Sequence, residues 1–145
     1  MDSYSNDSNT SEFESFIQIR VGTVLDIHRD VVENDGGIPG VLHYDLLESA
    51  VAAPLQAYGG VFLNSNVFLM AAAYLVGLSK NHAFIDGNKR TAVMLTYMFL
   101  EWQGYELVAD DFEMQEMVLG IIENKITKEE VADYLRTHTR LLDQD

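Results

Sequence analysis

The sequence predicts an all-α fold: a single compact bundle of about six helices, with a short hairpin or loop between two of them. Apolar residues make up 48% of the 145 residues, which is enough for a hydrophobic core in a chain of one-domain length. These residues recur mostly at the three- and four-residue spacing of helices. Segments that could form strands are few and short, and no internal repeat is present, so the pattern indicates one helical bundle.

The N-terminal part sets the boundary of the domain. Residues 1–12 are rich in Ser, Asn and Asp, so we expect a disordered tail there and the folded domain over residues 13–145. Thr23 is the expected N-cap of the first helix, which runs to about residue 34, while residues 15–21 could instead be extended. His28 lies on the apolar face of this helix and is interpreted as a core histidine rather than a ligand.

The later helices each have a recognisable boundary. Asn64 or Ser65 is expected to cap a long helix that is apolar nearly all round and therefore central to the bundle. Gly104 is the expected residue after the next helix, and Thr127 with Glu130 forms a capping box before the last one. Helices are predicted over residues 44–53, about 65–81, 88–103, 110–124 and 128–142, a loop over 35–40, a loop or short hairpin over 55–64, and an extended segment over 105–108.

Composition excludes several classes of function. Nine Lys and Arg against 23 Asp and Glu give a net charge of -14, which is too acidic for a protein that binds duplex nucleic acid. No cysteine is present, which excludes disulfides, a thiolate nucleophile and cysteine-based metal sites. The longest apolar run, residues 67–78, is too short to cross a bilayer. These features favour a soluble cytoplasmic protein.

The basic residues of the middle of the chain gather around one stretch, residues 82–92, between two predicted helices. Between residues 30 and 101 the only Lys and Arg are Lys80, Lys89 and Arg90. Cations in the first turn of a helix oppose its dipole and are unfavourable there. Lys89 and Arg90 therefore fit a turn that binds an anion with its free N–H groups. Gly87, just before them, allows a ligand to approach the backbone. The ordinary alternative is a solvated pair of charges.

Other residues of the stretch suit phosphate chemistry as well. Asp86 is a hard oxygen donor of the kind that Mg²⁺ uses alongside substrate phosphates, and His82 can accept a proton near neutral pH. Phe84 is expected to point inward and hold the loop. Taken singly, His82 is more often a helix C-terminal residue, and Asp86 and Asn88 are more often caps. Their joint occurrence favours a site for phosphate and metal.

The pattern His-x-Phe-x-Asp-x-Asn-Lys-Arg-Thr-Ala, residues 82–92, resembles the signature of the Fic/Doc family, in its Doc branch. The similarity extends over about residues 20–140. It includes the glycine-rich loop at 36–40, the helix that contains residues 46–50, and the closing helix that contains residues 131–135.

The resemblance implies a toxin of a toxin–antitoxin pair. Such a toxin uses Mg²⁺ and transfers the γ-phosphate of ATP to a Ser or Thr hydroxyl of a target protein. The target known in the family is elongation factor Tu, and its modification inhibits translation. The nucleotide would bind reversed relative to Fic enzymes. By position, the resemblance implies that His82 is the base for the hydroxyl, that Asp86 binds the metal and that Phe84 is a structural anchor. It implies that Gly87, Asn88, Lys89 and Arg90 form a turn that binds phosphate, and that Lys89 and Arg90 are also catalytic. It further implies that residues 56–64 form a flap for the target segment.

Three positions depart from the family pattern. Val93 stands where Fic enzymes have a second arginine, which argues against ordinary AMP transfer. Met94 stands where the Doc branch has asparagine, and Gly87 is the Fic choice where the Doc branch has alanine. The alternatives are therefore a Fic-type AMP transferase and a catalytically weak Doc-like binding module. No inhibitory Ser/Thr-x-x-x-Glu-Gly/Asn motif occurs, so an antitoxin protein is expected in trans, with no nucleic-acid or membrane partner.

Overall fold

The computed structural model describes residues 19–142. Six α-helices and two short two-stranded sheets lie within them, which confirms the all-α prediction. The expected tail over residues 1–12 lies outside the described residues, as do residues 13–18 and 143–145. The helices are α2 (Val21–Asp35), α3 (Tyr44–Ala52), α4 (Val67–Asn81), α5 (Asn88–Trp102), α6 (Asp111–Ile122) and α7 (Lys128–Thr137), and a 3-10 turn, η1 (Ala53–Leu55), follows α3.

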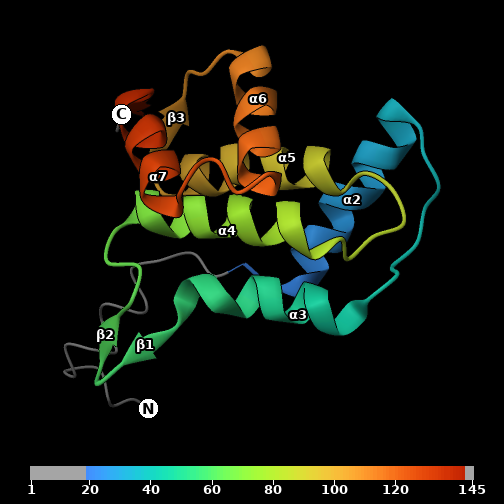
Figure 1. Ribbon diagram of the computed structural model, residues 1–145, viewed down its shortest axis with the longest axis horizontal. Helices are drawn as coiled ribbons and strands as arrows, with labels where there is room; N and C mark the ends of the chain where they lie inside the picture. Colours follow the sequence, from blue (N-terminus) through green and yellow to red (C-terminus); the bar gives the residue numbers. More distant parts are fainter. Residues whose placement is uncertain (1–18, 143–145) are drawn as a thin grey trace.

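Helix α4 lies at the centre of the bundle, as predicted. It packs against α3 on one side and against α6 and α7 on the other, with α5 alongside it (Figure 1). Met70, Tyr74 and Leu75 of this helix are completely buried. Because α4 is apolar on nearly all sides, each neighbour buries its own apolar stripe against it. No helix in the described part of the chain is long and apolar enough to span a membrane.

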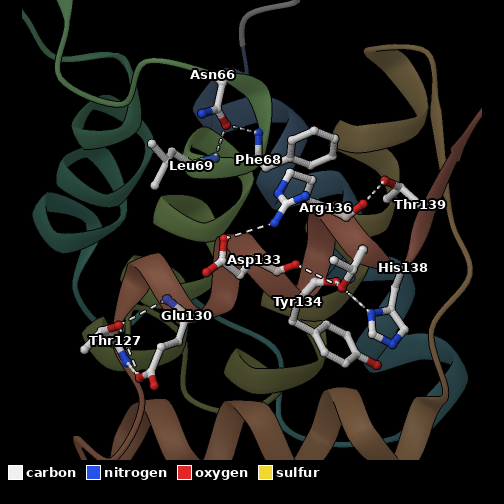
Figure 2. Close-up of polar contacts among 11 residues, drawn as sticks. Asn66, Phe68, Leu69, Thr127, Glu130, Asp133, Tyr134, Arg136, His138 and Thr139 are labelled. Atoms are coloured by element: carbon white, nitrogen blue, oxygen red, sulfur yellow. Dashed lines mark hydrogen bonds and ion pairs between the residues drawn. The ribbon is translucent and has the colours of Figure 1, made fainter.

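The cap of α4 is Asn66 rather than the predicted Asn64 or Ser65. Its Oδ1 accepts hydrogen bonds from the N–H groups of Phe68 and Leu69, at 2.9 and 3.0 Å (Figure 2). Asn64 is buried, and its Oδ1 accepts a hydrogen bond of 2.6 Å from Lys128 Nζ. The side chain of Asn64 is therefore used to hold the start of α7 against the chain before α4, which a local capping rule could not reveal.

The predicted start of α2 at Thr23 is also wrong. The helix begins at Val21 after the N-cap Arg20, whose carbonyl accepts the N–H groups of Thr23 and Val24 at 3.0 and 3.3 Å. Gly22 lies inside the first turn, where the N–H groups have no intrahelical partner in any case. Packing of the apolar face of α2 on the core thus outweighs the weak helix propensity of this glycine.

The predicted last helix is too long, because its end forms a strand. Helix α7 ends at Thr137, and β4 (Thr139–Leu141) pairs antiparallel with β3 (Tyr105–Leu107). The extended segment predicted at residues 105–108 is thereby confirmed, and the strand that it pairs with is β4, which follows α7. An exposed ion pair between Arg140 and Glu106, at 2.7 Å, joins the two strands.

The hairpin expected within residues 55–64 is present, but it lies far from the motif. Its strands β1 (Ala57–Tyr58) and β2 (Val61–Phe62) pair antiparallel just before α4, whereas His82 follows the opposite end of that helix. A helix of 15 residues is about 22 Å long. Figure 1 shows the hairpin at one end of α4 and the connection to α5 at the other. The expectation that residues 56–64 form the flap beside the reacting groups is therefore wrong.

The capping box of α7 yields a prediction about stability. Thr127 Oγ1 accepts the N–H of Glu130 at 3.1 Å, and Glu130 Oε1 accepts the N–H of Thr127 at 2.9 Å. We expect Thr127→Ala to lower the free energy of unfolding by about 1 kcal/mol, as N-cap losses do. Thr23→Ala is the matched control, and it should leave stability unchanged or slightly higher, because alanine is the better helix former. Urea denaturation measures both, and equal losses would contradict the observed helix starts.

Candidate active site

The first part of the motif, residues 82–87, forms the connection between α4 and α5, and the rest begins α5. His82 ends α4 with a left-handed backbone (φ 50°), and Gly87 precedes α5 with φ 82°. The two left-handed residues let the chain reverse, so that α5 runs back along α4 (Figure 1). The side chain of His82 is exposed and makes no hydrogen bond within residues 19–142. Its imidazole is therefore free to meet a molecule that approaches from solvent.

The extended segment after α2, residues 36–43, runs along this connection. The N–H of Leu42 donates to the carbonyl of Ala83 at 2.7 Å, and the N–H of Ile85 donates to the carbonyl of Gly40 at 3.2 Å. These bonds satisfy backbone groups that no helix or sheet of the motif itself could satisfy. Residues 36–43, and not the hairpin before α4, therefore form the wall next to the motif.

Two aromatic rings hold the motif from the inside. Phe84 is only 2% exposed, and its ring stacks on that of His28 with 3.7 Å between the ring centres. Nε2 of His28 donates a hydrogen bond of 2.8 Å to the backbone carbonyl of Asp86. His28 is therefore a buried histidine with its polar atom satisfied, which agrees with its interpretation as a core residue.

Asn88 closes the motif onto the start of α5. Its Oδ1 accepts the N–H of Phe84 at 2.9 Å, and its Nδ2 donates to the carbonyl of Phe84 at 2.8 Å. Both halves of the carboxamide are thus used to satisfy one residue of the loop. The phosphate contact expected of Asn88 stays a prediction, and its backbone N–H at the start of α5 is the group left for it.

Asp86 presents a carboxylate at the edge of the loop. Its Oδ2 accepts the N–H of Ile38 at 2.8 Å, and the side chain is partly exposed. Gly37 makes this approach possible, because a Cβ there would lie only 3.2 Å from Cβ of Asp86. Within residues 19–142, no group of three or more acidic or histidine side chains could hold a metal by itself. A single carboxylate suits a Mg²⁺ ion whose other ligands are nucleotide phosphates and water.

The two cations of the first turn of α5 have different surroundings. Lys89 is exposed and makes no ion pair within the described residues. Arg90 lies between two carboxylates, at 3.5 Å from Asp35 at the end of α2 and at 3.0 Å from Asp111 at the start of α6. Burial, followed by the nearby Asp111 carboxylate, raises the pKa of Tyr97, which also lies on α5. The free N–H groups of α5 and Lys89 therefore make the positive part of the site.

Two cavities flank Arg90. One, of about 360 Å³, lies between α5 and α6 beside Lys89, and Val93 forms part of its wall. The other, of about 160 Å³, lies between α2 and α5, and Met94 forms part of its wall. Val93 and Met94, two of the three departures from the family pattern, thus face different cavities. The remaining residues that line the first cavity are Gln115, Glu116, Val118 and Leu119.

Comparison with other proteins identifies the family. Residues 18–100 match the model of the Fic/DOC family. The chain belongs to this family. It is 31% identical over 113 residues to the protein kinase doc of Escherichia phage P1, a match that covers 78% of this chain and 88% of that protein. It is 44% identical over 75 residues to the toxin Doc of Mycolicibacterium smegmatis, which covers 52% of this chain and 58% of that protein. These relatives place this Fic/DOC domain in the Doc branch, as its motif predicted.

Two features of this Fic/DOC site could not be predicted from the sequence, because both are contacts between distant segments. One is the bond from His28 to the carbonyl of Asp86, and the other is the pair of carboxylates around Arg90. The glycine-rich run at residues 36–40 predicted a loop, but it did not identify the residues that this loop contacts. Only the packing of α2 and α6 beside α5 shows these contacts.

The double hydrogen bond of Asn88 leads to a second prediction. We expect Asn88→Ala to lower the free energy of unfolding by about 1–3 kcal/mol, because it leaves both backbone groups of Phe84 without their partner. Asn81→Ala is the control, because Asn81 makes one exposed hydrogen bond, of 3.1 Å, to the carbonyl of Leu46. This substitution should lower the free energy of unfolding by less. Denaturation in urea compares the two variants. A smaller loss for Asn88→Ala would contradict its role as a brace of the loop.

Proposed function

We propose that this chain is a Doc-like toxin that transfers the γ-phosphate of ATP to a Ser or Thr hydroxyl of a protein. The observation that carries the proposal is the turn at which α5 begins. Free helix N–H groups, the unpaired cation of Lys89 and the guanidinium of Arg90 converge there, next to Asp86 and His82. Such a turn favours bound phosphate and the charge that develops during its transfer. The names of the two relatives, a toxin and a protein kinase, support the same proposal.

In this reaction His82 acts as the base. Its imidazole accepts the proton of the target hydroxyl while the hydroxyl oxygen attacks the γ-phosphorus. A new P–O bond forms to the target, and the bond from the γ-phosphorus to the oxygen that bridges it to the β-phosphorus breaks. ADP leaves with that oxygen. The proton passes from His82 to solvent, which its exposed position permits.

Asp86 is the residue that we assign to Mg²⁺. Its carboxylate is held in place by the N–H of Ile38, and one carboxylate is what a phosphate-bound Mg²⁺ requires. When bound, Mg²⁺ neutralises phosphate charge and orients the transferred group. The binding of both ATP and Mg²⁺ is part of the proposal.

The cavity between α5 and α6 supports a particular orientation of the nucleotide. Its apolar walls, Val93, Val118 and Leu119, suit a nucleoside rather than phosphates. The residue in the position of the second Fic arginine is Val93, so Lys89 and Arg90, both from the first turn of α5, are the cations that line this cavity within the described residues. We therefore infer that the nucleoside lies in this cavity and that the phosphates extend toward His82. This orientation brings the γ-phosphate next to the target hydroxyl.

Residues 36–43 offer a surface for the protein substrate. The segment is extended next to the motif, and Ile38, Leu42 and Ile85 are apolar side chains exposed around it. An extended target segment can add to such a backbone edge and place its hydroxyl near His82. The family resemblance suggests elongation factor Tu as the target, in the cytoplasm, and an antitoxin protein that inhibits in trans.

AMP transfer is the second candidate, and Gly87 favours it. Glycine is the residue of Fic enzymes at this turn, and its φ of 82° is easily adopted by glycine. In that reaction the α-phosphate, not the γ-phosphate, would be attacked, with pyrophosphate as the leaving group. The two candidates differ in which labelled phosphate reaches the protein.

A label-transfer assay tests the proposal. Purified protein free of antitoxin is incubated with Mg²⁺, cell lysate and ATP labelled at either the α- or the γ-phosphate. We expect label on protein from the γ position only, and none with His82→Ala, which should still fold and bind ATP. Label from the α position would establish AMP transfer instead. Absence of transfer from both positions would favour a binding module without catalysis.

A third prediction concerns the cations of the turn. Lys89→Ala and Arg90→Ala should each slow transfer more than tenfold, because each removes a charge from the developing negative phosphate. Lys125→Ala is the control, since Lys125 is an exposed lysine paired only with Glu123 and should not change the rate. Initial rates of label transfer at saturating target measure the effect. Full activity in both variants of the turn would refute the assignment of the phosphate site.

A fourth prediction tests the position of the nucleoside. Leu119→Trp places a larger side chain in the cavity between α5 and α6 and should raise the KM for ATP about tenfold, with little effect on the KM for the target. Phe112→Trp is the control on the same helix, because Phe112 is exposed and does not line that cavity. An unchanged KM for ATP in Leu119→Trp would place the nucleoside elsewhere.

A further inference from the structure

We propose that His28 is a positioning residue for the phosphate-binding turn. Its ring would hold the peptide that joins Asp86 to Gly87 in the orientation that phosphate transfer requires. This inference rests on the proposed function, because the orientation of that peptide matters only if the turn binds phosphate. His28 lies in the middle of α2, is 5% exposed and does not belong to the motif.

Two contacts fix the ring relative to the loop. The ring is stacked nearly parallel on Phe84, with an angle of 7° and 3.7 Å between the ring centres. Its Nε2 lies 2.8 Å from the carbonyl oxygen of Asp86. A carbonyl can only accept a hydrogen bond, so Nε2 carries the hydrogen. The stacking sets the plane of the ring, and the hydrogen bond then sets the direction of the carbonyl.

The direction of this carbonyl determines the geometry of the turn. A peptide is planar, so the carbonyl of Asp86 and the N–H of Gly87 point in opposite directions. By holding the carbonyl on the inner side, His28 turns the N–H of Gly87 outward, where α5 begins. The same residue, Asp86, is held a second time by the N–H of Ile38 on its carboxylate, at 2.8 Å. Helix α2 and the segment after it therefore hold both the backbone and the side chain of Asp86.

Packing alone does not explain a histidine at this position. An apolar side chain of similar size would fill the space without the cost of burying a polar ring, but it would leave the carbonyl of Asp86 without its donor. The surroundings also have room for a slightly larger ring. A cavity of about 360 Å³ between α2 and residues 39–41 borders His28.

Two substitutions separate the two contacts. His28→Phe keeps a ring that can stack on Phe84 and removes the hydrogen bond, while His28→Gln removes the ring and keeps a side-chain donor. We expect His28→Phe to lower kcat for label transfer about tenfold, with the KM for the target within twofold of wild type. The Mg²⁺ concentration for half-maximal rate should rise as well. His28→Gln should recover the rate to within about threefold of wild type.

A second measurement does not depend on catalysis. Amide hydrogen exchange reports on the loop directly, and we expect faster exchange at Phe84 and Ile85, whose N–H groups are hydrogen-bonded, in His28→Phe than in wild type. The thermal midpoint of unfolding should fall by only a few degrees, as expected for one lost hydrogen bond, so that the variant stays folded in the assay. This measurement still tests the role of His28 if the wild-type protein transfers no phosphate, a result that would contradict the proposed function alone.

His138→Phe is the matched control. The ring of His138 is stacked on Tyr134, with 3.8 Å between ring centres, and its Nδ1 bonds the carbonyl of Tyr134 at 2.8 Å, at the end of α7 (Figure 2). Like His28→Phe, this substitution keeps a ring that can stack and removes the hydrogen bond of the histidine, but at a position outside the site. It should leave kcat and loop exchange unchanged.

Three outcomes would overturn the positioning role. They are unchanged loop exchange in His28→Phe, an unchanged kcat despite faster exchange, and a rate in His28→Gln as low as that in His28→Phe. A decrease in kcat of the same size in His138→Phe would show a general loss of stability instead, and it would overturn the proposal too. Slower transfer with faster loop exchange in His28→Phe, and recovery in His28→Gln, support it.

Discussion

The backbone of residues 82–87 forms no regular secondary structure, so its polar groups must find partners in other parts of the chain. Three parts supply them: residues 36–43 outside, His28 inside, and Asn88 at the start of α5. These bonds keep His82 in solvent and direct the start of α5 toward the same side. The arrangement of the candidate site therefore depends on this set of hydrogen bonds more than on any single side chain of the motif.

Local signals predicted most of the fold, and distant contacts account for the errors. The pair Thr127 and Glu130 lies within one turn, so its pattern located the start of α7. The strand at residues 139–141 depends on pairing with residues 105–107, more than 30 positions away, and helical periodicity could not reveal it. The same distinction holds for the site. His82, Asp86 and Lys89 belong to one continuous motif, whereas the flap at residues 56–64 was expected only from the family resemblance.

The distribution of charge reconciles an acidic chain with an anionic ligand. Arg90 is shared between Asp35 and Asp111, so it links α2, α5 and α6 while no anion is near. Ion pairs that are half exposed contribute little stability, so a phosphate can compete for this guanidinium. Lys89 has no such partner among residues 19–142, so its charge is available to the proposed ligand.

The contacts that hold Asp86 also determine when the site can form. His28 and Ile38 lie 58 and 48 positions before the residue that they bind, so a long loop must close before either bond exists. During synthesis, α2 emerges from the ribosome well before the motif, and the arrangement cannot be complete until α5 has followed it. A chain that stops before that point carries no assembled site. If the proposed function holds, the chain would thus become active only after its own translation has passed the motif.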